Sequence, residues 1–163
     1  MSDLAAKLIR NIAGAPSRHL SRGPNYEGDI TRLTPGTAAR KLGASCYTLE
    51  PGKKICPYHL HHGQEELFFI VEGSGILRVA GEELPVRPGD VIFIPPGPDH
   101  PHQLIAGPDA PLRYLAVSTM EDPEICEYPD SGKFLAEGSL GSATPFEIIE
   151  RRGEGRDYWE DEA

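Results

Sequence analysis

From Ser45 onward, apolar side chains occur in short runs that glycine and proline repeatedly interrupt. Runs of this length, bounded by turn residues such as Pro51-Gly52 and Pro88-Gly89-Asp90, predict β-strands. The predicted strands are Ser45–Leu49, Ile55–His61, Glu66–Val71, Ile76–Val79, Glu83–Val86, Val91–Ile94, His102–Ile105 and Leu112–Ser118. Short strands in such close succession predict an all-β fold, either a barrel or a jelly roll.

The N-terminal segment has a helical pattern at first and then loses it. Between Ser2 and Ile12 the apolar residues fall on one helical face, with Ser2 as the expected N-cap and Gly14 as the expected stop of a short packing helix. The apolar residues on this face are Leu4, Leu8, Ile9 and Ile12. From Pro16 to Gly43, turn-forming residues replace the periodic pattern, which predicts an irregular arm that wraps the domain.

The pattern is also sparse beyond Met120. The stretch EDPEICEYPDSGKF predicts a structured loop, and PFEIIERR predicts one further strand. The acidic end contains Trp159 and is expected either to pack back onto the body or to fray. At 163 residues we expect one domain, with residues 1–44 as helix and wrapping arm, 45–120 as the β-barrel core, and 121–163 as a C-terminal loop, strand and acidic tail that pack on it.

Composition excludes several classes of function. A formal net charge of −9 and a pI of about 5.1 argue against nucleic-acid binding, because no segment supplies a concentrated basic surface. No apolar run approaches the roughly 20 residues that span a bilayer, and the N-terminus lacks the uncharged core of a signal peptide, so we expect a cytoplasmic protein without a membrane partner. Cys46, Cys56 and Cys126 show no CxxC spacing, which predicts neither disulfides nor a thiolate zinc site.

The stretch PYHLHHGQEELFFIVEG carries the candidate chemistry. Alternate side chains of a strand share a face, so His59 and His61 are expected to point the same way. In the next strand Glu66 is expected opposite them, at a polar mouth over an apolar floor. The floor is predicted to consist of Ile55, Phe68, Ile70 and Leu104. His62 and Glu65 have the opposite parity and are expected to face outward.

A metal ion would need a further ligand from a distant strand. His100 and His102 follow a Pro-Pro-Gly bend two residues apart, so either is a candidate. Imidazole and carboxylate ligands suit divalent iron, manganese, nickel, cobalt, zinc or copper, and the donor set does not choose among these ions.

At this point the sequence resembles the cupin superfamily. Gly52, His59-x-His61, Glu66 and Gly73 look like the first cupin motif, with one extra residue before the first histidine, and Gly89, Pro95-x-Gly97 and His100 look like the second. The longer stretch PHQLIAGPDAPLRYLAVSTMEDPEICEYPDSGK is similar to small single-domain bacterial cupins, in which HQ follows a Pro/Gly-rich bend.

The resemblance implies a germin-like double-stranded β-helix, here a jelly-roll barrel with a short N-terminal helix and irregular N- and C-terminal arms. The second alignment implies His102 as the fourth ligand, with Ala106 in place of the usual asparagine and His100 as the rival. It also implies a homodimer, since cupins of this kind commonly dimerise and Leu67, Phe69 and Val71 are apolar on the outer face.

The resemblance allows three functions. A metal-dependent sugar or sugar-phosphate isomerase comes first, a metal-dependent dioxygenase second, and a non-catalytic small-molecule-binding cupin third. A phosphosugar would require cations near the mouth, for which Lys53 and Lys54 are candidates. The strand arginines Arg78, Arg87 and Arg113 are expected to be solvated. No catalytic residue beyond the ligands is predicted.

Overall fold

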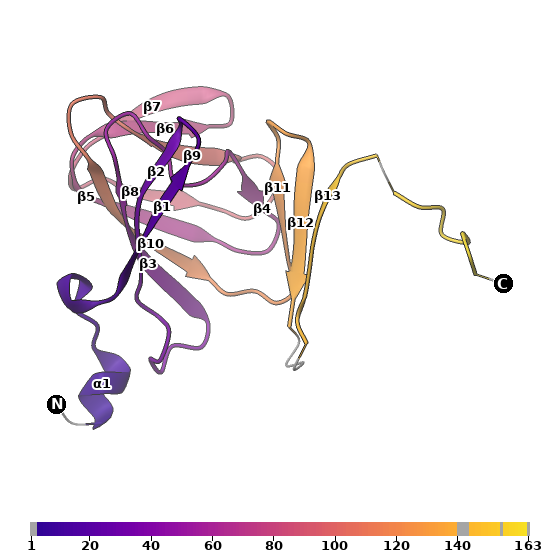
Figure 1. Cartoon of the computed structure of the whole chain (residues 1–163), viewed down its shortest axis with the longest axis horizontal. Coiled ribbons are helices and arrows are strands. Elements are labelled where there is room, and N and C mark those ends of the chain that lie inside the picture. The colour runs from indigo at the N-terminus through magenta and orange to yellow at the C-terminus, as the bar shows by residue number, and fades with distance from the viewer. Residues whose placement is uncertain (1–2, 140–143, 154, 163) are drawn as a thin grey trace.

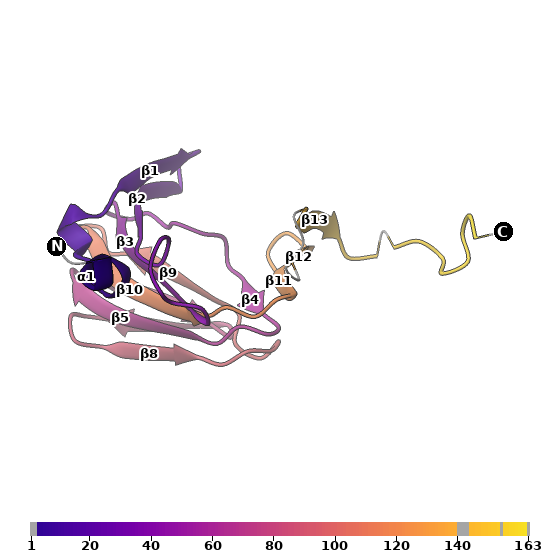
Figure 2. The same cartoon turned by 90° about the horizontal axis from the view of Figure 1, so that it is seen from below.

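Short antiparallel strands account for nearly all of the regular structure in the computed structural model, which describes residues 3–139, 144–153 and 155–162 (Figure 1). The largest sheet has the order β1-β2-β3-β10-β5-β8. Its strands are β1 (Ser17–Arg22), β2 (Tyr26–Arg32), β3 (Leu42–Leu49), β10 (Leu112–Thr119), β5 (Glu66–Glu72) and β8 (Val91–Ile94). The sheet curls so that β1 and β2 lie on the opposite side of the barrel from β8 (Figure 2).

Two smaller sheets complete the fold. One has the order β7-β6-β9 and the other β13-β12-β11-β4. Their strands are β7 (Glu82–Val86), β6 (Gly75–Val79), β9 (His102–Ala106), β13 (Phe146–Arg151), β12 (Lys133–Gly138), β11 (Glu124–Tyr128) and β4 (Leu60–His61). The nearly all-β architecture agrees with the predicted jelly roll.

The core lies between the large sheet and the β6–β9 layer. Alternation along β5 buries Phe68 and Ile70, while Phe69 and Val71 face outward. The predicted apolar floor of Ile55, Phe68, Ile70 and Leu104 belongs to the buried cluster, together with Leu49, Leu112 and Tyr114.

The prediction of an irregular arm is wrong for residues 17–32. Strands β1 and β2 pair antiparallel from Ser17–Thr31 to Arg22–Tyr26, and β2 extends the large sheet through β3. Polar residues dominate β1 because only Leu20 among its side chains is even partly covered. The apolar strand signal is therefore weak.

The N-terminal helix is shorter than predicted, and its apolar face is not buried. It spans α1 (Asp3–Leu8), followed by the 3-10 turn η1 (Ile12–Gly14), and Leu4, Leu8 and Ile9 are exposed. The expected N-cap Ser2 lies outside the described residues. Among the described residues, no helix has both the length and the apolar character that crossing a membrane requires.

The C-terminal region contains more strand than predicted. The stretch expected to be a structured loop forms the β11–β12 hairpin, while the predicted strand PFEIIERR is β13. These strands stand beside the barrel, and the tail beyond them extends away from it (Figure 1). Trp159 is accordingly exposed.

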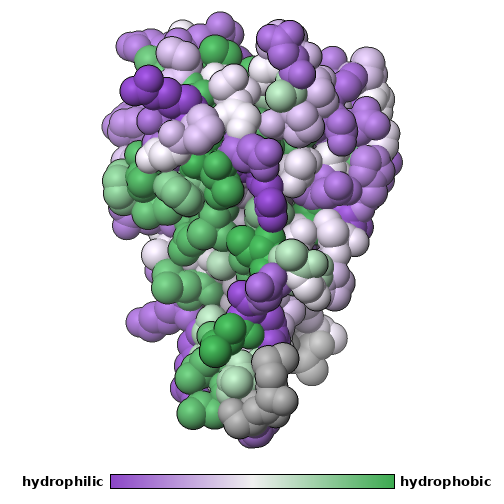
Figure 3. Space-filling model, turned by 90° about the vertical axis from the view of Figure 1, so that its left-hand side faces the viewer, coloured by the Kyte–Doolittle hydropathy of each residue, from purple (hydrophilic) through white to green (hydrophobic). Residues whose placement is uncertain are grey.

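Apolar side chains gather on the side of the molecule that carries α1 and the β5–β8 edge (Figure 3). Phe69 and Val91 are paired across β5 and β8, as are Leu67 and Phe93, so these side chains share one outer face. Phe93 is 66% exposed in the single chain.

Candidate metal centre and its cavity

His59 and His102 lie directly opposite each other. The His59 N–H donates to the His102 carbonyl at 3.1 Å, and the His102 N–H donates to the His59 carbonyl at 2.7 Å. This antiparallel bridge brings the two imidazole centroids to 4.5 Å. Residues distant in sequence are thus placed together by backbone hydrogen bonds.

Only the end of the predicted strand Ile55–His61 is a regular strand. Pro57 has no N–H to donate, and the Cys56 carbonyl accepts a hydrogen bond from the Gln103 side chain at 2.8 Å instead of from a strand ladder. The backbone still carries His59 and His61 into the same cavity. The orientation expected from strand parity is therefore retained over an irregular segment.

Glu66, the first residue of β5, faces these histidines. Its Oε2 lies 2.8 Å from His102 Nε2 and 3.5 Å from His61 Nε2. One ligand atom each from His59, His61 and Glu66 fall within 4.8 Å of one another. Three imidazole nitrogens and one carboxylate oxygen thus converge from β4, the segment before it, β5 and β9.

The orientation of the donor atoms fits a cation between them. His102 Nε2 and Glu66 Oε2 are buried and lie 2.8 Å apart, yet neither atom has a hydrogen-bond partner of acceptable geometry within the described part of the chain. The Nδ1 atoms of His59 and His102 lie 2.9 Å and 3.1 Å from the carbonyls of Pro57 and His100. An Nδ1–H donated to a carbonyl leaves the Nε2 lone pair free to coordinate a metal.

The charge states of the donors also suit a metal. Burial, reinforced by the neighbouring His102, lowers the pKa of His59 to about 4, so its imidazole is neutral at neutral pH. Burial acts to raise the pKa of Glu66, but the imidazoles of His102 and His61 outweigh it and hold that pKa below its usual value. Neutral imidazole and ionised carboxylate are the forms that bind divalent ions.

The other candidates lie elsewhere. His100 is exposed and borders a separate apolar pocket beside β8, whereas His102 is 1% exposed within the cluster. His62 faces outward, where its Nε2 lies 2.6 Å from Glu127 Oε1, and Glu65 is exposed. Of the alternatives that the sequence left open, the geometry favours His102, and the ligand set stays a prediction.

A cavity of about 550 Å³ opens in front of the donor atoms. Phe68 and Leu104 form part of its apolar wall, and Tyr47 and Tyr114 stack at 5.2 Å on another side. Burial raises the pKa of both tyrosines, which remain neutral phenols at physiological pH. Cys56 also borders the cavity, and burial raises the pKa of its thiol to about 12.

The sequence pattern did not reveal the arginines of the cavity. Lys53 donates to the Pro24 carbonyl at 2.6 Å, and neither Lys53 nor Lys54 lines the cavity. Among the described residues its basic lining side chains are Arg18 and Arg32. The turn residues Gly23-Pro24-Asn25 between two polar-alternating stretches were the available signal for the hairpin that carries these arginines.

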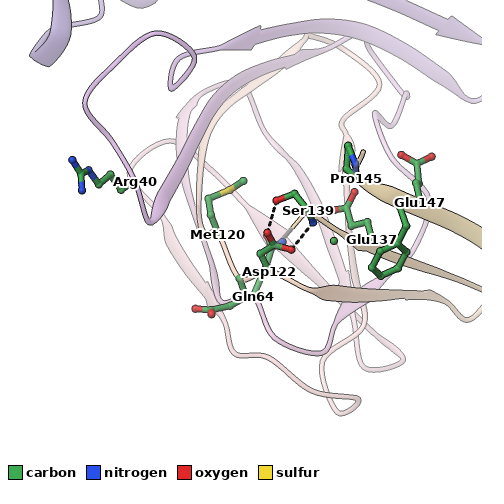
Figure 4. A pocket seen from close by; sticks show the side chains of 11 residues that line it. Arg40, Gln64, Met120, Asp122, Glu137, Ser139, Pro145 and Glu147 are labelled. Carbon is green, nitrogen blue, oxygen red and sulfur yellow. Dashed lines mark hydrogen bonds between the residues drawn. The ribbon is translucent and has the colours of Figure 1, made fainter. Parts of the chain in front are cut away.

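A second hollow of about 690 Å³ adjoins this cavity and shares Gln64, Met120 and Glu137 with it (Figure 4). It lies between the end of β10 and the β12–β13 strands and is rich in carboxylates. Asp122 accepts hydrogen bonds there from the backbone and hydroxyl of Ser139. Among the described residues that line this hollow there is no histidine, in contrast to the candidate metal centre.

The family model for the cupin domain matches residues 45–118. The chain contains a cupin domain. Solved structures support the fold over almost the whole chain: proteins named as sugar phosphate isomerases from Acidithiobacillus ferrooxidans and Silicibacter pomeroyi superpose with TM-scores of 0.80 and 0.77. They are 23% and 24% identical to this cupin, cover 95% and 92% of it, and are themselves covered over 98% and 96% of their chains. At these identities the likeness concerns the fold.

Curated relatives match only part of the chain. The uncharacterized protein MJ1618 of Methanocaldococcus jannaschii is 37% identical over 73 residues, which are 42% of this chain and 57% of that protein. The oxalate-binding protein of Thermotoga maritima is 33% identical over 69 residues, or 42% and 54% of the two chains. The 5-nitrosalicylic acid 1,2-dioxygenase of a Bradyrhizobium species is 29% identical over 101 residues, or 56% and 45%. The chain spans about half the length of these relatives.

Proposed function

We propose that this cupin is a metal-dependent enzyme that binds a small, oxygen-rich substrate beside a divalent transition ion. His59, His61, Glu66 and His102 would hold the ion. The observation that carries the proposal is the approach of two buried donor atoms, His102 Nε2 and Glu66 Oε2, to 2.8 Å without a hydrogen bond on the wall of a sizeable cavity. Burial of such groups without partners is costly unless something else satisfies them.

The ion would polarise a substrate oxygen and stabilise negative charge that develops on it. The rest of the cavity is suited to orient the substrate. Tyr47 and Tyr114 are neutral phenols that can donate hydrogen bonds, and Phe68 excludes water from one wall. Among the described residues that line the cavity, Glu137 on β12 is the one carboxylate that does not belong to the proposed ligand set.

Isomerisation of a sugar or sugar phosphate is the first reaction to test. It requires adjacent substrate oxygens to be held and a base to move a proton between neighbouring carbons. Glu137 is our candidate for that base, because it borders the cavity without belonging to the donor cluster. The fold shared with proteins named as sugar phosphate isomerases makes such sugars the first substrates to screen.

Dioxygenation is the second candidate. The observation in its favour is the 29% identity to a 5-nitrosalicylic acid 1,2-dioxygenase over 56% of this chain, together with the apolar wall of Phe68 and Leu104. Binding without catalysis is the third candidate, favoured by the 33% identity to an oxalate-binding protein.

A homodimer is also part of the proposal. The outer face of β5 and β8 presents Phe69, Val91 and Phe93 to solvent in the single chain. A contiguous apolar face of this kind is typical of a protein interface. A second copy of the chain is its proposed cover.

Elemental analysis followed by two activity screens tests the proposal. The purified protein is expected to contain about one transition ion per chain, and the His102→Ala variant is expected to lose this ion while His100→Ala keeps it. Sugar phosphates are then incubated in deuterium oxide, where isomerisation by proton transfer introduces solvent deuterium. Oxygen uptake is measured in parallel with salicylate-type substrates.

The results separate the candidates. Zinc with deuterium incorporation and no oxygen uptake supports the isomerase and excludes the dioxygenase. Iron with substrate-dependent oxygen uptake excludes the isomerase. A bound ion and oxalate binding without turnover favour the binding protein, and failure to bind any transition ion after reconstitution contradicts all three metal-dependent functions.

A further inference from the structure

The β1–β2 hairpin presents two arginines to the metal cavity. Arg18 pairs with Ile30 across the hairpin, so the two side chains share a face. Alternation adds Leu20 and Arg32 to this face, and all four residues line the cavity. The hairpin thus offers the cavity an apolar centre of Leu20 and Ile30 with a guanidinium on each strand.

The opposite face of the hairpin has a different composition. His19 and Asp29 are paired in the strand register, and their side chains approach to 3.0 Å between Nδ1 and Oδ1. The carboxylate of this hairpin pair therefore lies on the face away from Arg18 and Arg32. Because of this register, Asp29 does not neutralise the positive charge of the two arginines.

Within the described part of the chain, neither the Arg18 nor the Arg32 guanidinium has an ion-pair or hydrogen-bond partner. Other arginines do: Arg78 forms a two-point pair with Asp130 at 2.7 and 2.8 Å, and Arg156 pairs with Glu160 at 2.6 Å. An unpaired arginine on a strand can simply be solvated. Arg18 and Arg32, however, share one face that borders the candidate metal cavity, in a protein of net charge −9. Solvation alone does not explain why two unpaired guanidinium groups lie together there.

Arg32 also stands close to the chemistry of the site. Its positive charge acts on Tyr47, where it lowers the phenol pKa against the larger effect of burial. Arg32, Tyr47 and Glu66 together border a smaller cavity of about 310 Å³ that adjoins the first. A ligand that contacts Glu66 would therefore lie close to Arg32.

We propose that Arg18 and Arg32 bind an oxyanion of the substrate, a phosphate or a carboxylate, while the metal centre holds its other oxygens. Guanidinium groups suit this role because their planar donors match the oxygens of both anions. The inference rests on the proposed function in that the same cavity holds the metal site. It narrows the substrate class to small anions and assigns a ligand-binding role to the N-terminal hairpin.

Anion binding by arginine variants tests this assignment. Inorganic phosphate and malonate are titrated by calorimetry into the full chain, both metal-loaded and after removal of metal by chelation. We expect Arg18→Met and Arg32→Met each to weaken binding by about tenfold to a hundredfold, as for loss of a charge-assisted hydrogen bond. Arg22→Met is the matched control: it removes the same charge from β1 at a residue that does not line the cavity, and should change affinity less than about twofold.

Each outcome decides the matter. Selective loss in the Arg18 and Arg32 variants supports the assignment, and a preference for phosphate or malonate tells which oxyanion the substrate carries. No anion binding by the wild type, or equal loss in the Arg22 variant, overturns it. If a methionine variant does not fold, the lysine variants carry the same comparison, because they keep the charge but lose the planar fork. A wild-type protein that binds anions but no transition ion refutes the proposed function and leaves the arginine assignment standing.

Discussion

Nδ1 of His61 lies 3.5 Å from Oε1 of Glu124, a carboxylate on β11 that is only 3% exposed. The same carboxylate accepts hydrogen bonds from the backbone N–H groups of His62, at 3.0 Å, and Gly63, at 3.2 Å. Strand β11 therefore fixes the turn after β4 and places a carboxylate beside the imidazole whose other nitrogen faces Glu66. Partners of this kind orient a metal-binding histidine and increase its basicity.

We predict that Glu124→Gln weakens metal binding by about tenfold or more, because the imidazole of His61 loses its charged partner. Competition with a chelator measures the affinity. Glu127→Gln is the matched control on the same strand, since Glu127 pairs with His62 and Arg152 and not with His61. Equal affinities in the Glu124 variant and the wild type would show that the carboxylate does not position the ligand.

Alanine substitutions of the neighbouring residues His61 and His62 are expected to have opposite effects on metal content. His61→Ala should lose the ion, since the side chain faces Glu66, and His62→Ala should retain it, since the side chain pairs with Glu127 at the surface. Elemental analysis of the two purified variants makes the comparison. Retention in the His61 variant and loss in the His62 variant would mean that the cluster is wrongly assigned.

Gly73, just after β5, is expected to tolerate no side chain. Its φ is +77°, and a Cβ there would lie 2.0 Å from the Pro111 carbonyl oxygen. Gly73→Ala should lower the free energy of unfolding by more than about 2 kcal/mol, because backbone strain and a clash with rigid backbone add. Gly81→Ala is the control: its φ is +85°, but apart from its chain neighbours no described residue has an atom within 4 Å of the added Cβ, so only the conformational cost of about 1–2 kcal/mol applies. Urea denaturation that gives equal losses would contradict the role of the Pro111 contact.

The proposed dimer makes a prediction about Phe93. Replacement by glutamate places a charge on the outer β5–β8 face and should shift the protein from dimer to monomer at micromolar concentration. Size-exclusion chromatography with light scattering gives the mass. Ile125→Glu is the control on β11, with 44% exposure away from this face. A wild-type monomer, or a Phe93 variant that remains dimeric, would rule out this interface.

Strand positions in the barrel could be predicted where alternation and turn residues agree. Val91–Ile94 has the predicted bounds, because Asp90 and Pro95 delimit an apolar run. The β1–β2 hairpin was missed since its side chains cover a cavity instead of a packed core, so polar residues such as Arg18 occupy inward positions. Apolar periodicity reveals strands that bury one face in the core, and it gives no signal for strands whose inner face borders a solvent-filled cavity.

The candidate site, too, could be predicted only in part from the sequence. Parity along one chain segment placed His59 and His61 on one side, as the structure has them. The proximity of His102 depends on a bridge between distant segments, and that of Glu124 on the pairing of β11 with β4. Such contacts arise from tertiary register, which local patterns do not encode. The arginines of the cavity belong to this second group.

X-ray absorption spectroscopy of the metal-loaded protein tests the central claim most directly. The account predicts a single ion with only nitrogen and oxygen neighbours, including the multiple-scattering signature of three imidazoles from His59, His61 and His102. Cys56 also lines the cavity, so a sulfur ligand is the concrete alternative. A sulfur shell, or fewer than two imidazoles around the bound ion, would contradict the account.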